Sequence, residues 1–190
     1  MADIKRLFFD CETTGVLYFK HGIHELSGII DVNGVIVDKF EFKVCPHPKV
    51  IIEDAALEIS KKTKEEILSY PDRFDVFKEL NELLGKYVDK YTKKDKYFLI
   101  GYNNAGFDNY FLRAFWKQCG DDKYFGSWFW PNPIDVYVLI SQKLIEKRTE
   151  IDDFKLLGIA KYFGINVDET KLHNALYDIE ITRELYYKVI

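Results

Sequence analysis

The sequence predicts an α/β domain in which helices cover both faces of a central mixed sheet whose first three strands are antiparallel. Three observations predict it. An apolar run opens the chain, two β-rich segments flank an Asn-Gly dipeptide, and helical periodicities alternate with short apolar runs from residue 63 onward. Strands that are followed by alternating helices and strands are typical of a mixed sheet between helical layers.

The opening strands come from local patterns. Residues 4–9 form a short apolar run that ends at a charged cluster, which predicts a buried strand. Residues 25–32 and 35–44 are rich in Ile, Val and Phe. The Asn33-Gly34 dipeptide between them suits a two-residue hairpin turn, because both of its positions adopt positive φ.

The rest of the chain alternates helices with short strands. The capping box of Thr63 to Glu66 predicts a short helix that ends before Pro71. Helical spacing of apolar residues, with glycine as a terminator in one case, then predicts helices and strands in this order: helix 74–88, strand 97–100, helix 107–116, strand 134–136 continuing into a helix as far as 145, helix 154–163 and a last helix over 175–189.

Composition limits the class of protein. A length of 190 residues without linker or repeat predicts one domain over 1–190, and 47% hydrophobic residues exclude a disordered chain. A net charge of −4 argues against a protein that coats duplex DNA. Three cysteines without paired spacing, no secretory leader and no apolar stretch of about 20 residues predict a cytoplasmic protein without a membrane span.

The first chemical signal is Asp10-Cys11-Glu12 at the end of the opening strand. Side chains alternate along a strand, so Asp10 and Glu12 project together and Cys11 points the other way. Two buried carboxylates repel each other and are held together best by a divalent cation with hard-oxygen ligands. The alternative is a solvated strand end where two acids fall by chance, and this pair alone does not exclude it.

Two further signals follow later in the chain. After the strand 97–100, Asn104 is placed to cap the next helix and Asp108 to lie in its first turns. His173 and Asp178 are five residues apart, so they would not share a helix face, and His173 is expected to precede the helix. There it suits a general base, although a surface histidine is the alternative.

Taken together, the three signals resemble one family. D-x-E-T-T-G, N-x-x-F-D and H-x-A-x-x-D occur in that order, similar to the DEDD superfamily of 3′-to-5′ exonucleases in its histidine-bearing branch. That branch includes the proofreading exonuclease subunit of bacterial DNA polymerase III, ribonuclease T and oligoribonuclease. The resemblance spans nearly the whole chain and implies a ribonuclease H-like fold.

The resemblance also implies a set of site residues. Asp10, Glu12, Asp108 and Asp178 would hold two divalent cations, Mg²⁺ with Mn²⁺ as a substitute, and His173 would be the general base. The catalytic residues are these five. Asp135 is expected to be a supporting acid. Asn103 replaces a histidine found in many relatives.

Substrate contacts are expected from the loop after the first strand and from the N-x-x-F-D segment. The implied substrate-binding residues are Thr13, Thr14, Gly15, Val16, Leu17, Asn104 and Phe107. The backbone of the first three would meet the terminal nucleotide, Val16 or Leu17 would lie against its base and Phe107 beneath it. Tyr18, Phe19, Tyr102 and residues 128–130 are candidates for further base stacking or for the core.

The resulting hypothesis is a metal-dependent 3′-to-5′ exonuclease that releases nucleoside 5′-monophosphates from single-stranded DNA ends, in proofreading or repair. Its partners would be single-stranded 3′ ends, with a DNA polymerase or a second copy of the chain also considered. The alternatives are an RNA-trimming exoribonuclease and an inactive nucleic-acid-binding relative. The presence of all five catalytic residues argues against the inactive relative.

Overall fold

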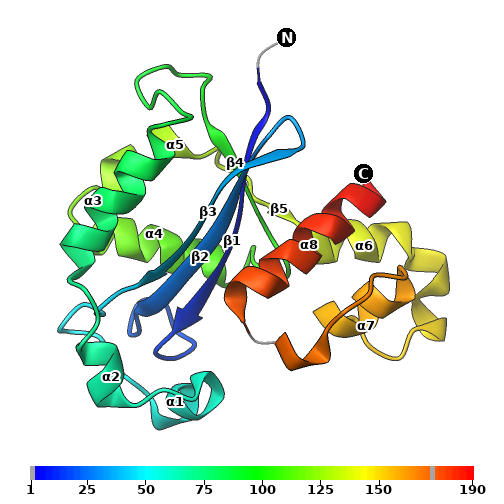
Figure 1. Ribbon diagram of the computed structural model, residues 1–190, viewed down its shortest axis with the longest axis horizontal. Helices are drawn as coiled ribbons and strands as arrows, with labels where there is room; N and C mark the ends of the chain where they lie inside the picture. Colours follow the sequence, from blue (N-terminus) through cyan, green and yellow to red (C-terminus); the bar gives the residue numbers. More distant parts are fainter. Residues whose placement is uncertain (1–2, 172–173) are drawn as a thin grey trace.

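The computed structural model describes residues 3–171 and 174–190 and has one central five-stranded sheet (Figure 1). Its order is β3-β2-β1-β4-β5. The strands are β1 (Lys5–Thr13), β2 (Ile23–Val32), β3 (Val35–Lys43), β4 (Tyr97–Gly101) and β5 (Ile134–Asp135). β1, β2 and β3 are antiparallel, whereas β4 is parallel to β1 and to β5. The expected mixed sheet and its antiparallel first half are confirmed.

The β2–β3 hairpin follows the turn chemistry of its sequence. Asn33 and Gly34 adopt φ of 54° and 88°, as a two-residue turn with positive φ requires. The pairing of Phe8 with Ile100 places the end of β4 beside the middle of β1, two residues before Asp10. The polar residues that follow these two strands therefore lie at one edge of the sheet.

The helices form a layer on each face of the sheet. Their bounds are α1 (Asp54–Ser60), α2 (Lys64–Leu68), α3 (Arg73–Leu84), α4 (Asp108–Gln118), α5 (Phe125–Trp128), α6 (Val136–Lys143), α7 (Leu156–Tyr162) and α8 (Ala175–Val189), with short 3₁₀ turns at Asp122–Tyr124, Ile145–Glu150 and Glu169–Lys171. Figure 1 shows α3, α4 and α5 on one side of the strands and α6, α7 and α8 on the other. None of the helices in the described ranges is both long and apolar enough to cross a membrane.

Two hydrophobic clusters fill the spaces between the layers. Leu7, Phe9 and Cys11 of β1 point into the cluster made with α3, α4 and α5. Phe8, on the opposite face of β1, belongs to the cluster made with α6, α7 and α8. Because side chains alternate along a strand, Asp10 and Glu12 share the face of Phe8, the face that α8 covers.

Two helices are not predicted by the sequence patterns. α1 buries none of its residues, so it has no apolar stripe that a periodicity could reveal. α5 has four residues, which is too short for a helical repeat to be recognised. Both are local additions to the predicted architecture.

Candidate active site

Asp108 begins α4, directly after the loop that leaves β4. It is 6% exposed, and the backbone N–H of Cys11 donates a hydrogen bond of 3.2 Å to its Oδ1. Burial, followed by the charges of Glu12 and Asp135, raises the pKa of Asp108 to about 7. The contact ties the start of α4 to the end of β1 and brings two of the sequence motifs together.

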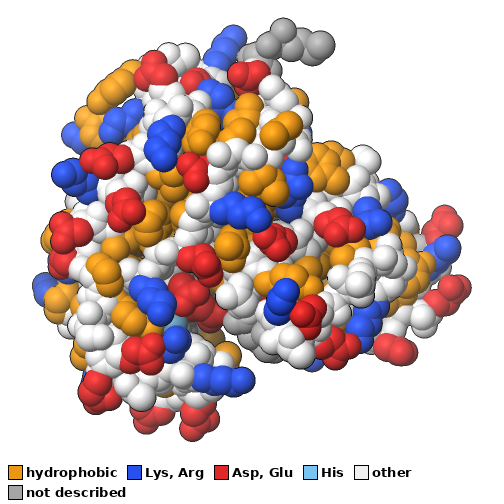
Figure 2. All heavy atoms as spheres, in the orientation of Figure 1, with side chains coloured by type: hydrophobic (Ala, Val, Ile, Leu, Met, Phe, Trp, Pro, Cys, Tyr) orange, Lys and Arg blue, Asp and Glu red, His pale blue; other side chains and the backbone are white. Residues whose placement is uncertain are grey.

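Asp10 lies where the acidic charges meet. Burial raises its pKa well above the ordinary range, and the charges of Asp108, Glu12 and Asp178 raise it further. Carboxylates from β1, α4 and α8 therefore converge at one end of the sheet. Figure 2 shows Asp and Glu side chains gathered beside the hollow between the lobe of α1 and α2 and the lobe of α7.

α8 supplies the fourth carboxylate. Asn174 caps the helix by accepting a 2.9 Å hydrogen bond from the N–H of Tyr177, and Asp178 follows in the first turn. The helix begins at Ala175, so His173 precedes it in the sequence, as expected. His173 itself lies outside the described residues, and its role as a general base stays a prediction.

The donor chemistry of the four acids suits a hard divalent cation. Their oxygens are the ligands that Mg²⁺ takes, and their mutual repulsion is relieved by positive charge. In residues 3–171 and 174–190, no three acidic, histidine or cysteine side chains are grouped tightly enough to form a metal site by themselves. The four acids therefore suit a divalent cation by their charge and by their oxygen ligands.

Asp135 supports the loop that leads to Asp108. It is 9% exposed and accepts hydrogen bonds from the backbone N–H groups of Asn103, Ala105 and Tyr137 at 2.9, 3.1 and 3.0 Å. It thereby caps α6 and fixes the β4–α4 connection. Asn103 has a φ of 55°, a conformation that Asn tolerates better than most residues.

The expected capping role of Asn104 is wrong. α4 begins at Asp108 with Phe107 in the cap position, so the helix starts too late for the Asn104 side chain to reach its first N–H groups. The side chain is 1% exposed and packs on Gly101, where a Cβ atom would lie 2.6 Å from its Nδ2. Its backbone oxygen instead accepts from Asn109 Nδ2 at 2.9 Å. Substrate binding by Asn104 stays a prediction.

The loop after β1 divides into anchored and exposed residues. Thr14 is fully buried, and its hydroxyl donates to the Ile51 oxygen at 2.7 Å and accepts from the Gly22 N–H at 3.0 Å. Thr13 Oγ1 donates to the Gly15 oxygen at 2.8 Å. Val16 is 68% exposed, which leaves its side chain accessible to a ligand.

His21 organises this loop and was not identified from the sequence. It is 1% exposed, its Nδ1 accepts from the N–H of Leu17 at 2.9 Å, and its Nε2 lies 3.1 Å from Glu53 Oε1. The ring lies so close to Gly15 that a Cβ atom there would come within 2.6 Å of it. Position 15 therefore requires glycine because a larger residue would clash with the His21 ring. The sequence pattern around His21 does not reveal this contact.

Phe107 directly precedes Asp108 in the N-x-x-F-D segment. Its ring contacts Phe111 with a centroid distance of 4.9 Å and packs against the hydrophobic cluster of α3 and α4. It is only partly buried, so part of the residue remains accessible. Contact with a nucleotide is a prediction at this residue, as it is at Thr13, Gly15, Val16 and Leu17.

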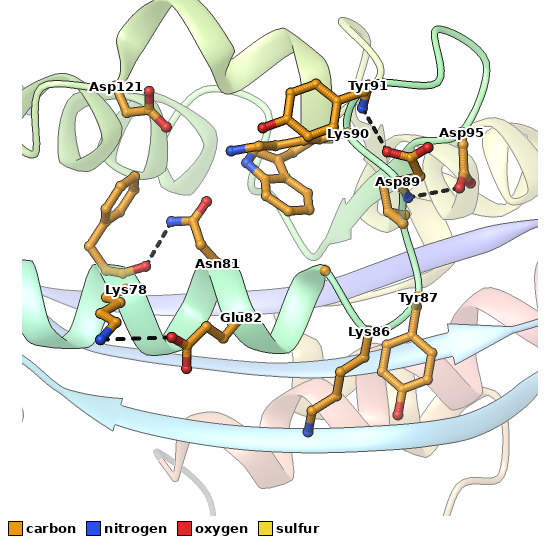
Figure 3. A pocket seen from close by; sticks show the side chains of 14 residues that line it. Lys78, Asn81, Glu82, Lys86, Tyr87, Asp89, Lys90, Tyr91, Asp95 and Asp121 are labelled. Carbon is orange, nitrogen blue, oxygen red and sulfur yellow. Dashed lines mark hydrogen bonds and ion pairs between the residues drawn. The ribbon is translucent and has the colours of Figure 1, made fainter.

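A separate pocket of about 820 Å³ lies between α3, residues 85–95 and Trp128. Figure 3 shows its acids and lysines, with Asp89 and Asp95 joined through the backbone N–H of Asp89. Asp95 also pairs with Lys5 at the beginning of β1. The pocket is therefore at the end of the sheet opposite to the four carboxylates and is not part of the candidate site.

The fold and the converging acids define a nuclease of the ribonuclease H-like class. The exonuclease family model RNase_T matches residues 7–186, and the chain belongs to this family, within the DEDD superfamily. It is an exonuclease.

Similar proteins add detail to this assignment. The DNA polymerase III PolC-type protein of Staphylococcus aureus is 27% identical over 191 residues, which cover 100% of this chain and 12% of that protein. The structure of E. coli Exonuclease I in complex with a dT13 oligonucleotide has a TM-score of 0.74 at 21% identity and covers 98% of this chain and 41% of that one. Its zinc-bound complex with ssDNA has a TM-score of 0.76 at 20% identity, covering 98% and 40%. The chain thus spans a small part of its PolC relatives and less than half of Exonuclease I.

Proposed function

We propose that this exonuclease removes nucleotides from the 3′ ends of single-stranded DNA, releases nucleoside 5′-monophosphates and requires divalent cations, with Mg²⁺ as the physiological ion and Mn²⁺ as a substitute. The observation that carries the proposal is the convergence of Asp108, Glu12 and Asp178 on Asp10, whose pKa they raise together with burial. In this cluster Asp108 is buried and the other three acids are partly buried, so their mutual repulsion is costly unless cations offset it.

Four carboxylates and one imidazole divide the chemistry. Asp10, Glu12, Asp108 and Asp178 hold the cations. Bound there, two cations would supply an activated water and would neutralise the charge that develops on the phosphate and the leaving oxygen. His173, which precedes α8 in the sequence, is proposed to accept a proton from the attacking water.

The loop after β1 positions the last nucleotide. The backbone of Thr13, Thr14 and Gly15 contacts it, and the two hydrogen bonds of the Thr14 side chain hold this segment in place. Val16 or Leu17, which are 68% and 37% exposed, lies against the base. Phe107 closes the site from the side of α4.

The preference for single-stranded DNA is supported by the similar proteins. Exonuclease I is described in complex with dT13 and dA16 oligonucleotides, and PolC is a DNA polymerase. Association with a polymerase or with a second copy, and a single exonuclease domain over residues 1–190, are part of the proposal. A cytoplasmic location is proposed as well, because Cys11, Cys45 and Cys119 are free thiols.

The first test is digestion of a 5′-labelled single-stranded DNA oligonucleotide with Mg²⁺, beside an RNA of the same sequence. A ladder that shortens from the 3′ end is expected on DNA, and excess EDTA should abolish it. A ladder on RNA alone would replace the DNA proposal by the exoribonuclease alternative, since the 2′-hydroxyl distinguishes the two substrates.

Substitutions test the residues. Asp10→Asn and Asp108→Asn should each lower the rate by about 10³-fold or more, because each removes a cation ligand whose effect is worth several kcal/mol in the transition state. His173→Ala should also lower it strongly. The matched control is Asp152→Asn, which changes an exposed aspartate and should leave the rate unchanged. Turnover in EDTA, or an active Asp10→Asn, would contradict the proposal.

A further inference from the structure

The outer face of α4 carries a ring and two cations in a row. Tyr110, Arg113, Ala114 and Lys117 stand at positions i, i+3, i+4 and i+7 of the helix and therefore share one face. Tyr110 is 50% exposed, and the side chain of Arg113 is 60% exposed. The opposite face, with Asp108 and Phe111, is buried. The buried side of α4 therefore includes the proposed catalytic acid Asp108, whereas its exposed side carries an aromatic ring and two cations.

The loop after β1 lies against this solvent side. The ring of Tyr18 stacks on that of Tyr110, with centroids 5.1 Å apart and planes inclined by 18°, and Phe19 meets Tyr18 edge to face at 5.5 Å. Tyr18 and Phe19 are 42% and 66% exposed. With Arg113 and Lys117 these rings line a groove of about 740 Å³.

We infer that this groove binds single-stranded DNA on the 5′ side of the nucleotides held at the carboxylates. The inference rests on the proposed function and extends it from the terminal nucleotide to the strand behind it. Exposed rings stack on bases of any sequence, and exposed cations contact the phosphates between them. The groove begins two residues beyond Asp108 and a few residues beyond Glu12, so the same loop and the same helix form both sites.

Charge and length agree with this ligand. Arg113 pairs with Asp122 at 3.6 Å, and both side chains are about half exposed, so a phosphate can compete for the guanidinium. Lys117 is exposed. From Asp108 to Lys117 the helix rises about 14 Å, which spans several phosphates of a strand. The chain has a net charge of −4, so a local basic groove is a way to hold a polyanion.

The test is equilibrium binding of a fluorescent (dT)12 in EDTA, measured by anisotropy. EDTA prevents hydrolysis and removes the contribution of the cations, so binding reports the groove. Tyr110→Ala should raise Kd about 5- to 100-fold, as expected for a lost base stack, and Tyr110→Phe should bind like the wild type because the ring remains. The loss should be larger for (dT)12 than for (dT)3.

A matched pair of lysines tests the phosphate contact. Lys117→Ala should reduce the slope of log K against log salt by about 0.7, the value for one phosphate contact on a single strand. Lys78→Ala, a change of the same charge on the exposed face of α3, should not change the slope. Equal effects at both lysines, an unchanged Kd in Tyr110→Ala, or no binding by the wild type in EDTA would overturn the inference. If the protein bound (dT)12 in EDTA but did not digest DNA with Mg²⁺, the proposed function would be refuted, whereas the inferred binding of single-stranded DNA in the groove would not.

Discussion

Two regions of the sheet hold aspartates in opposite electrostatic surroundings. Asp31, fully buried near the end of β2, accepts hydrogen bonds from Arg183 Nη2 at 2.7 Å, from Tyr187 at 3.0 Å and from the N–H of Gly34 at 2.9 Å, and Arg6 Nη1 lies 3.3 Å away. Asp10 is surrounded by other acids, which raise its pKa.

The difference separates a structural acid from a proposed catalytic one. The charge of Asp31 is offset by the protein itself, through side chains of β1 and α8, and the contact fixes α8 against the β2–β3 hairpin. The acids around Asp10 instead add charge of the same sign, which a bound cation would offset. The first region holds α8 in place, and α8 carries Asp178 to the second.

Paired Asp→Asn substitutions test this comparison most directly. Asp31→Asn should lower the free energy of unfolding by about 3–5 kcal/mol, because it leaves two arginines largely buried without their partner. Asp10→Asn in EDTA should leave the free energy unchanged or raise it, because it removes a repelled charge. Urea denaturation followed by circular dichroism measures both. Equal losses in the two variants would show that both acids are structural.

Mg²⁺ should act on one region only. At a free concentration 100 times its Kd, the ion should raise the free energy of unfolding of the wild type by about 2.7 kcal/mol, because it binds the folded state. The same increment should persist in Asp31→Asn and disappear in Asp10→Asn. Thermal melts with and without Mg²⁺ provide the measurement. An undiminished increment in Asp10→Asn would place the cation elsewhere.

Sequence reasoning reached the parts of this molecule that depend on local signals. The turn at Asn33-Gly34 and the cap at Thr63, which accepts from the Glu66 N–H at 3.1 Å, follow from neighbouring residues. Asp10, Glu12 and Asp108 are expected from the ends of two strands, which parallel pairing places side by side, whereas Asp178 is implied by the family resemblance. Asp31 could not be identified because Arg183 and Tyr187 lie about 150 residues away, and His21 could not because its packing on Gly15 appears only in the folded loop.

His24 extends the comparison to a buried base, and its effect should be the smallest. It is 1% exposed, neither ring nitrogen has a hydrogen-bond partner within the described ranges, and burial, with Lys62 adding to it, lowers its pKa to about 4.

Because the unfolded chain has a histidine pKa near 6.5, it binds more protons than the folded chain between pH 6.5 and 4. Stability should therefore be full above pH 6.5 and fall by roughly 2 kcal/mol as the pH drops to about 4.5. His24→Phe should remove this part of the pH dependence, and His47→Phe, at a less buried histidine, should remove much less of it. Urea denaturation at pH 7.5 and 4.5 gives the change in the free energy of unfolding for each variant. The contribution of the carboxylates is common to the variants and cancels when these changes are compared. If the two substitutions changed the pH dependence equally, burial of His24 would not be its cause.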